Sequence, residues 1–204
     1  MSGRIVFLTE EESIGAALRH LLPNLFPEFR EQQHWLIIPH QGKSDLEHSF
    51  PKKMKAWREP GVKFVILRDN DGADCLALKQ RLVRMVPNGA PDYLIRIVCQ
   101  ELEGWFLGDM GAVAAAYPRA SRQQSFKSLS RKDPDSLPNA ADLMMRLTGT
   151  QAKVTRATLI ATHMQPALNR STSFGVFVSG ISRFFSSPTE NDADPSTMNP
   201  PHNH

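Results

Sequence analysis

The chain has 204 residues, of which 41% are hydrophobic and 22% charged, values that are ordinary for a globular protein with its own core and that exclude a largely disordered or fibrous chain. Its formal net charge of +3 at pH 7 is too small to indicate nucleic-acid binding by itself. The longest apolar runs, residues 5–8 and 35–38, are much shorter than the roughly 20 residues that cross a bilayer, and the N-terminal residues do not have the pattern of a secretory signal peptide. We therefore expect a cytoplasmic protein without a membrane span.

Short apolar runs bounded by polar or turn residues predict four strands: Ile5–Thr9, His34–Ile38, Val62–Leu67 and Tyr93–Val98. Segments with helical spacing or composition separate them: Ser13–Leu22, Ser44–Trp57 and Ala73–Val86. Strands that alternate with helices favour βαβ units, and near-continuous apolar strands favour a sheet covered on both faces. The sequence thus predicts an α/β fold with a parallel four-stranded sheet.

The pattern changes after the fourth strand. Further helices are predicted at Gln100–Tyr117, with a break near Gly108, and at Ala140–Thr148, Lys153–Met164 and Phe174–Phe185, while residues 121–138 have the composition of a polar loop. The tail has almost no apolar side chains to bury. We therefore expect an α/β domain at residues 1–118, a helical extension at 119–185 packed on the same domain, and a disordered tail at 186–204.

The cysteines and the basic residues give weaker signals. Cys75 and Cys99 are too few for a disulfide framework and lack the CxxC spacing of a zinc site, so small core residues are the simpler interpretation. From Leu143 to Thr189 there is no Asp or Glu, which leaves the C-terminal half basic. A basic surface of this kind is typical of proteins that follow a nucleic-acid backbone.

Acidic residues follow two of the predicted strands. The first strand is followed by Glu10, Glu11 and Glu12, and the third by Asp69 and Asp71. At the carboxyl edge of an open parallel sheet, ligands bind where neighbouring strands send their connections in opposite directions. If the strand order is 2-1-3-4, the first and third strands are neighbours, and we expect Glu10, Asp69 and Asp71 to converge.

Such a cluster has the chemistry of a divalent-metal site. Mg²⁺ and Mn²⁺ prefer carboxylate and water oxygens, and two such ions can activate a water and stabilise the attacking and leaving oxygens of a phosphodiester. Without metal the carboxylates would raise one another's pKa, so we expect a positive group among them. Two simpler interpretations remain open: Glu10–Glu12 as acidic residues at a helix start, and Asp69–Gly72 as an Asx turn.

A third acidic motif follows the fourth strand and contains Glu101 and Glu103. Two residues apart on a helix, their side chains diverge and cannot both reach one ion. Glu101 is nearer the strand end, whereas Glu103 lies in a first helical turn, where a carboxylate is favoured in any case. We expect one of the two to be a metal ligand, and both stay open.

Four further residues are candidates for contacts with phosphate. Lys43 follows the second strand and either reaches a phosphate or is a solvated lysine before a helix. Arg68, directly before the Asp69 turn, is more typical of an ion-pair partner than of a catalytic cation. Arg170 and Ser173 precede a helix and form either an anion site or an ordinary capped helix start.

The order of a strand followed by Glu and a later strand followed by Asp-X-Asp resembles the Toprim domains of topoisomerases, primases and overcoming-lysogenization-defect nucleases. The chain resembles more specifically the bacterial domain-of-unknown-function family numbered 4276, over most of residues 4–184. Four segments carry this resemblance: FLTEEES, HQGKSDLEHSFPKKMKAWREPGVKFVILRDNDGADC, CQELEGWFLGD and NRSTSFGVFVSG.

The Toprim resemblance implies that Glu10 is the general acid/base glutamate and that Asp69 and Asp71 are the metal-binding pair. Many Toprim proteins have a glycine after the glutamate, where this chain has Glu11, which puts a close backbone approach to phosphate in doubt but not the metal site. The resemblance also implies a role in anti-phage defence beside an ATPase partner protein.

The leading hypothesis is a Mg²⁺- or Mn²⁺-dependent phosphodiester hydrolase that cleaves DNA or RNA. In it Asp69, Asp71 and one of Glu101 or Glu103 hold metal, and Glu10 holds metal or acts as general acid/base. The alternative is a non-catalytic binding or regulatory subunit that docks on an ATPase. A transferase or ligase lacks support because no nucleotide-binding loop is present, and a homodimer stays open.

Overall fold

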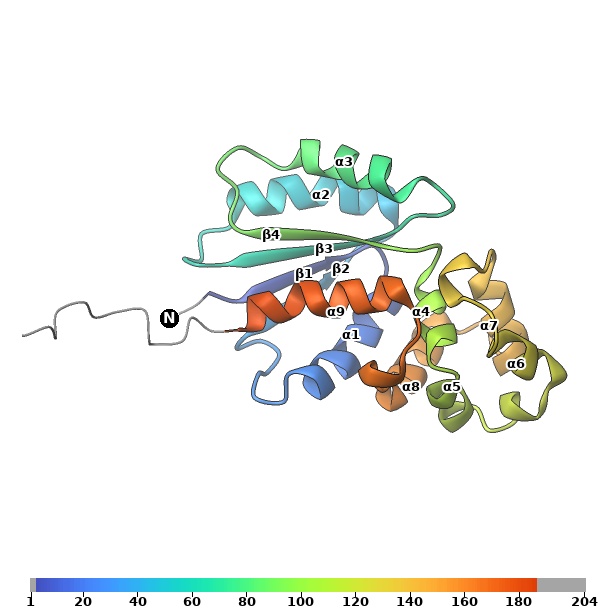
Figure 1. The fold of residues 1–204 in the computed structure, drawn as a ribbon. Coiled ribbons are helices and arrows are strands. Elements are labelled where there is room, and N and C mark those ends of the chain that lie inside the picture. Colours follow the sequence, from blue (N-terminus) through green and yellow to red (C-terminus); the bar gives the residue numbers. More distant parts are fainter. Residues whose placement is uncertain (1–2, 187–204) are drawn as a thin grey trace, which may run out of the picture.

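A computed structural model describes residues 3–186 of the chain. Its centre is one parallel sheet of four strands, β1 (Ile5–Thr9), β2 (Trp35–Pro39), β3 (Lys63–Asp69) and β4 (Tyr93–Val98), in the order β2-β1-β3-β4 (Figure 1). This confirms the predicted strand order. β3 is longer than its apolar run because Arg68 and Asp69 still pair with Ile97 and Val98 of β4. Asp69 is therefore the last residue of a central strand.

Helices cover both faces of the sheet. α2 (Lys43–Ala56) and α3 (Cys75–Met85) lie over one face, while α1 (Glu12–Leu25) and α9 (Thr172–Phe185) lie over the other (Figure 1). The strands are apolar on both sides because each face meets a helical layer. The smaller core cluster, which includes Leu46, Phe50, Leu78 and Leu82, fills the space under α2 and α3.

The remaining helices gather beyond the carboxyl ends of the strands, except the last of them, which packs along α1 (Figure 1). They are α4 (Leu102–Gly108), α5 (Met110–Ala116), α6 (Gln124–Leu129), α7 (Ala140–Thr148) and α8 (Lys153–His163), with 3-10 turns at Ala120–Arg122, Pro134–Ser136 and Pro166–Leu168. The segment predicted as a polar loop thus contains α6 and a 3-10 turn. The break predicted near Gly108 is present: α4 ends at Gly108, and the Asp109 side chain accepts a hydrogen bond from the Ala112 amide at 2.9 Å and starts α5.

The helical extension shares its core with the sheet. The larger core cluster runs from Ile5 and Phe7 of β1 to Phe177 and Phe185 of α9. α8 packs along α1, and its residues Ile160 and Ala161 are fully buried in that cluster. α8 therefore belongs to the same apolar core as β1, and this core fixes the position of α8 next to the carboxyl edge of the sheet.

Three further expectations concern the cysteines, the membrane and the tail. Cys75 and Cys99 are half-buried free thiols rather than core residues, and their Sγ atoms are 3.8 Å apart. No helix within residues 3–186 has the length and apolarity that crossing a bilayer requires. The predicted tail, 186–204, lies outside the described residues except for Ser186.

The contact between α8 and α1 gives a stability prediction. Ile160→Ala removes a fully buried side chain, and we expect it to lower the free energy of unfolding by about 2–4 kcal/mol in urea titrations. Its neighbour Leu159 is 41% exposed, so Leu159→Ala should cost under about 1 kcal/mol. Equal losses in the two variants would show that α8 is not packed as described.

Candidate functional site

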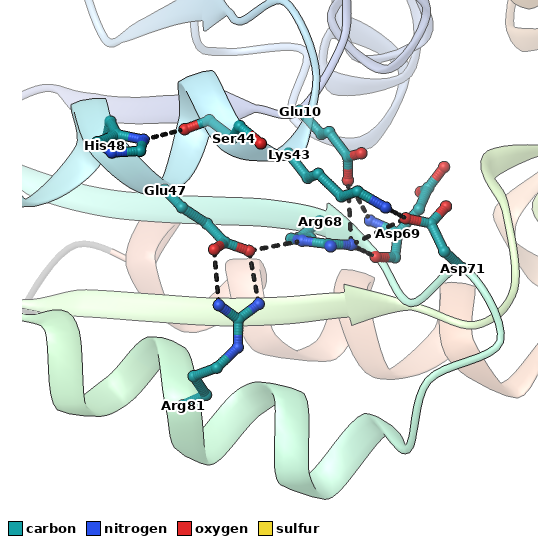
Figure 2. Close-up of polar contacts among 9 residues, drawn as sticks. All are labelled: Glu10, Lys43, Ser44, Glu47, His48, Arg68, Asp69, Asp71 and Arg81. Atoms are coloured by element: carbon teal, nitrogen blue, oxygen red, sulfur yellow. Dashed lines mark hydrogen bonds and ion pairs between the residues drawn. The ribbon is translucent and has the colours of Figure 1, made fainter.

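The adjacent strands β1 and β3 bring the first two predicted carboxylates together. Glu10 directly follows β1, and its amide donates to the Leu67 carbonyl of β3 at 3.1 Å. Its Oε2 accepts hydrogen bonds from the Asp69 amide at 3.0 Å and from Arg68 Nη1 at 3.4 Å. The predicted convergence of Glu10 and Asp69 is thus present at the carboxyl edge of the sheet (Figure 2).

Asp69 is the most confined carboxylate of the site. The residue is 8% exposed, and its buried Oδ1 has no hydrogen-bond partner. Burial raises the pKa of Asp69 well above its usual range, and the negative charges of Glu10, Glu11, Glu103 and Asp71 raise it further. Burial also raises the pKa of Glu10, although the Arg68 charge and the Asp69 amide oppose this. Asp69 therefore lacks a positive charge that would favour its ionised form, whereas Arg68 offsets only part of the effect of burial at Glu10.

Asp71 lies in the turn between β3 and α3, where it has a left-handed φ of 48°. The following Gly72 has φ 77°, a conformation that glycine adopts without strain. The Asp71 Oδ2 is 3.4 Å from both Lys43 Nζ and Arg68 Nη1, and its side chain is 43% exposed. Asp71 therefore shares the cation Arg68 with Glu10 and also contacts Lys43 at the more exposed side of the site (Figure 2).

Arg68 is the positive group that the sequence predicts among these carboxylates. Its side chain is only 6% exposed and pairs with Glu10, with Asp71 and with Glu47 of α2, the last at 3.2 Å. Glu47 is held in turn by a bidentate contact with Arg81 of α3 at 2.7 Å, and these ion pairs lower the pKa of Glu47 (Figure 2). Arg68 is thus an ion-pair partner, and its predicted contact with phosphate is untested.

The structure gives Glu101 and Glu103 different surroundings. Glu103 is 3% exposed, and its Oε1 accepts from Arg156 Nη2 at 2.6 Å. Glu101 Oε2 accepts from the Ala141 amide in the first turn of α7 at 2.8 Å, and Glu101 also lines an open hollow of about 360 Å³ together with Asp71. Glu101 is therefore the half-exposed member of the pair, and metal binding by either stays a prediction.

A third cation, Lys153, reaches the site from the helical extension. Lys153 is the first residue of α8, and its Nζ is 3.5 Å from Glu11 Oε2. Although burial opposes it, the charges of Glu11, Glu103 and Glu101 raise the pKa of Lys153. Lys153 and Glu11 line an open cavity of about 530 Å³ beside Gly42 at the start of α2. Sequence reasoning could not place Lys153 here, because its only signal was a basic stretch more than a hundred residues from Glu11.

The start of α9 differs from the predicted arrangement. Its N-cap is Ser171, whose Oγ accepts from the Phe174 amide at 3.0 Å. The carboxylate of Asp135 accepts hydrogen bonds from the Ser171 hydroxyl at 2.6 Å and from the Ser173 amide at 2.9 Å. The anion at this helix start is therefore a side chain of the chain itself, while Arg170 is exposed and donates to the Lys132 carbonyl. Phosphate binding by Arg170 and Ser173 stays a prediction.

The arrangement can hold a hard cation but is not closed around one. In residues 3–186 no three His, Cys, Asp or Glu side chains form a ready-made metal cluster. Glu10 and Asp71 face Arg68, whereas the free oxygen of Asp69 faces no cation. Chemically, the edge offers carboxylate oxygens at its centre and amines on two sides, from Lys43 and Lys153.

Comparisons with known proteins agree with this fold. Residues 9–182 match the family described as "Domain of unknown function (DUF4276)". The C-terminal region of the Xanthomonas campestris pv. campestris OLD protein is similar in structure, with a TM-score of 0.52 and 15% identity over 89% of this chain and 95% of that one. The corresponding region from Burkholderia pseudomallei has a TM-score of 0.52 and 17% identity over 91% and 100%. No curated protein is significantly similar in sequence.

Arg68 gives a prediction with an internal control. Arg68→Met leaves buried carboxylates without their counter-charge, so we expect it to lower the free energy of unfolding by about 3 kcal/mol at pH 7. Arg81→Met removes the other partner of Glu47, but Arg81 is half-exposed, and the expected loss is at most about 1 kcal/mol. Urea titrations of both variants at pH 7 measure this, and equal losses would contradict a central role for Arg68.

The raised pKa of Asp69 gives a pH prediction. Because the folded state holds a proton more tightly than the unfolded state, stability without divalent metal should fall as pH rises from the usual pKa of Asp, 3.8, through the folded pKa. Asp69→Asn should remove part of this loss and raise Tm at pH 7 by about 2–4 °C in metal-free buffer. Asp92→Asn, an exposed change next to the start of β4, is the matched control and should leave Tm unchanged. A lower Tm for Asp69→Asn at pH 7 would show that the carboxylate is satisfied without metal.

Proposed function

This chain belongs to the family of domains of unknown function numbered 4276 and has a Toprim-like fold, and from that premise we propose that it is a divalent-metal-dependent phosphodiester hydrolase acting on DNA or RNA. The observation that carries the proposal is the convergence of Glu10, Asp69 and Asp71 on adjacent strand ends, with a buried Asp69 oxygen that has no partner. This is the edge of an open parallel sheet at which ligands bind.

The residues fit Mg²⁺ or Mn²⁺. A buried carboxylate with a raised pKa and an unpartnered oxygen is an unfavourable arrangement until a cation joins it. Carboxylates from two neighbouring strands are the hard oxygen donors that these ions prefer. We propose that Asp69, Asp71 and Glu10 hold the metal, with Glu101 as the additional ligand because its carboxylate borders the same hollow as Asp71.

Bound metal would supply an activated water and positive charge for the phosphate in the transition state. In this proposal Glu10 also acts as general acid/base, because burial raises its pKa toward the range in which a carboxyl group can exchange protons. The buried Arg68 positions Glu10 and Asp71 through its ion pairs with both. Lys43 at the start of α2 contacts Asp71, Lys153 at the start of α8 contacts Glu11, and both side chains are at least half exposed. These two lysines would bind the phosphates of the nucleic-acid strand.

A second function rests on the ion pairs. Arg68 and Lys43 already pair with Glu10 and Asp71, so the edge is partly neutralised by the chain's own cations. This favours a non-catalytic subunit whose basic C-terminal half docks on a partner such as an ATPase. A role in phage defence would be compatible with either function.

Calorimetric titration with Mn²⁺, followed by a nuclease assay on the same samples, tests the proposal. Asp69→Asn and Asp71→Asn each remove one carboxylate, so we expect Mn²⁺ to bind at least about tenfold more weakly. The rate of metal-dependent cleavage of single- and double-stranded DNA and RNA should fall by about 100-fold or more.

Asp92→Asn serves as the matched control, because it makes the same chemical change next to the other end of the sheet. It should retain wild-type Mn²⁺ affinity and cleavage. Circular dichroism checks that all three variants are folded. If the folded wild type binds no divalent metal, the hydrolase is excluded and the partner-binding function takes its place.

A further inference from the structure

The two cysteines of the chain lie against each other at the rim of the site. Cys75 is the first residue of α3, and Cys99 directly follows β4. Their Sγ atoms are 3.8 Å apart, and both residues are half-buried, so a small oxidant can reach them. The proposed hydrolysis uses neither thiol. This contact between two distant parts of the sequence therefore has no role in the function described so far.

The same two segments carry the candidate metal ligands. Asp71 precedes Cys75 in the turn after β3, and Glu101 follows Cys99 by two residues. The turns are joined by a hydrogen bond from the Asp71 amide to the Gln100 carbonyl at 3.3 Å. Asp71 and Gln100 both have positive φ, 48° and 59°, a strained conformation for residues other than glycine. A covalent link at the cysteines would act on this pair of turns.

We propose that Cys75 and Cys99 are a redox-active pair that peroxide converts into a disulfide, joining the turn that carries Asp71 to the turn that carries Glu101. Cys75, which follows an exposed turn, attacks as its thiolate an oxygen of hydrogen peroxide, which breaks the O–O bond and gives a sulfenic acid and hydroxide. The other sulfur then attacks the first, the S–O bond breaks, and the released hydroxide takes up the thiol proton as water. In total two thiols and one peroxide give one disulfide and two waters.

The disulfide changes the geometry of the site. A disulfide needs an S–S distance of about 2.05 Å, so the sulfur atoms must approach each other by roughly 1.8 Å. Cys99 is anchored, because its amide donates to Ser173 Oγ at 3.0 Å. Cys75 follows an exposed turn, residues 71–74, which is the part that can move. We therefore expect the movement to displace Asp71 relative to Glu10 and Asp69.

The consequence for metal binding rests on the proposed function. Small divalent ions such as Mg²⁺ and Mn²⁺ tolerate little displacement of their carboxylate ligands. Oxidation should therefore weaken Mn²⁺ binding by about tenfold, and a dithiol reductant should restore it. The pair would then switch the site off under peroxide.

The first test is chemical and does not depend on metal. Wild type treated with hydrogen peroxide is digested with trypsin without reduction and analysed by mass spectrometry. A disulfide joins the tryptic peptides 69–79 and 97–119, with a loss of two hydrogens that dithiothreitol reverses. Cys75→Ser and Cys99→Ser provide controls in which this joined peptide cannot form. Peroxide-treated wild type that shows only sulfenic, sulfinic or methionine oxidation in these peptides overturns the proposal.

The second test measures Mn²⁺ affinity by calorimetry for reduced and oxidised wild type, with Cys75→Ser carried through the same peroxide treatment. Weaker binding only in oxidised wild type supports the switch, and equal affinity in a sample that contains the disulfide overturns it. If the disulfide forms but neither state binds Mn²⁺, the proposed hydrolase fails, and the redox control of metal binding fails with it. Mass spectrometry therefore tests the disulfide by itself, and the Mn²⁺ affinity of reduced wild type tests the proposed hydrolase by itself.

Discussion

The carboxyl edge of the sheet depends on one buried cation, Arg68. Like-charged carboxylates on neighbouring strand ends repel strongly in a site with little water, and the cost falls when a positive charge lies between them or when one of them binds a proton. Arg68 supplies that charge to Glu10 and Asp71, while its other nitrogen is held by Glu47, which Arg81 positions from α3. The strand β3 and the helices α2 and α3 therefore form one support for the carboxylates. Asp69 is the exception, because its buried Oδ1 has no hydrogen-bond partner. A metal ion at this edge would therefore stabilise Asp69 more than the other carboxylates.

The helical extension supplies the opposite side of the same edge. Arg156 of α8 neutralises Glu103, and Lys153 at the start of α8 reaches Glu11. Both cations are placed by the apolar packing of α8 on α1, so a loss of core contacts in the extension would also move charges at the site. Stability and electrostatics are coupled here because one helix contributes to both. A sheet with only its three connecting helices, α1, α2 and α3, would leave Glu11 and Glu103 without these counter-charges.

Much of the fold could be predicted because it depends on local pattern. Apolar runs located all four strands, and the expected strand order 2-1-3-4, on which the convergence of Glu10 and Asp69 depended, is the observed one. The boundaries of β3 were less accurate, because Arg68 and Asp69 are polar residues inside a strand whose pairing with β4 is not visible in the sequence. The roles of Asp135 at the start of α9 and of Lys153 at Glu11 could not be predicted, since each depends on a contact between segments far apart in the chain. Local patterns gave the carboxylates, and long-range packing decided their partners.

The backbone geometry at Glu11 accommodates a departure from the Toprim pattern. The glycine common after the Toprim glutamate raised doubt about this position, but Glu11 has φ −141°, an extended conformation that any residue adopts. The backbone therefore does not require glycine here. The side chain instead bonds to Ser13 at the start of α1 and pairs with Lys153 of α8. The substitution thus adds a negative charge beside Asp69 and ties that charge to the helical extension, so in this chain the cation from α8 and the extra carboxylate are best understood as one unit.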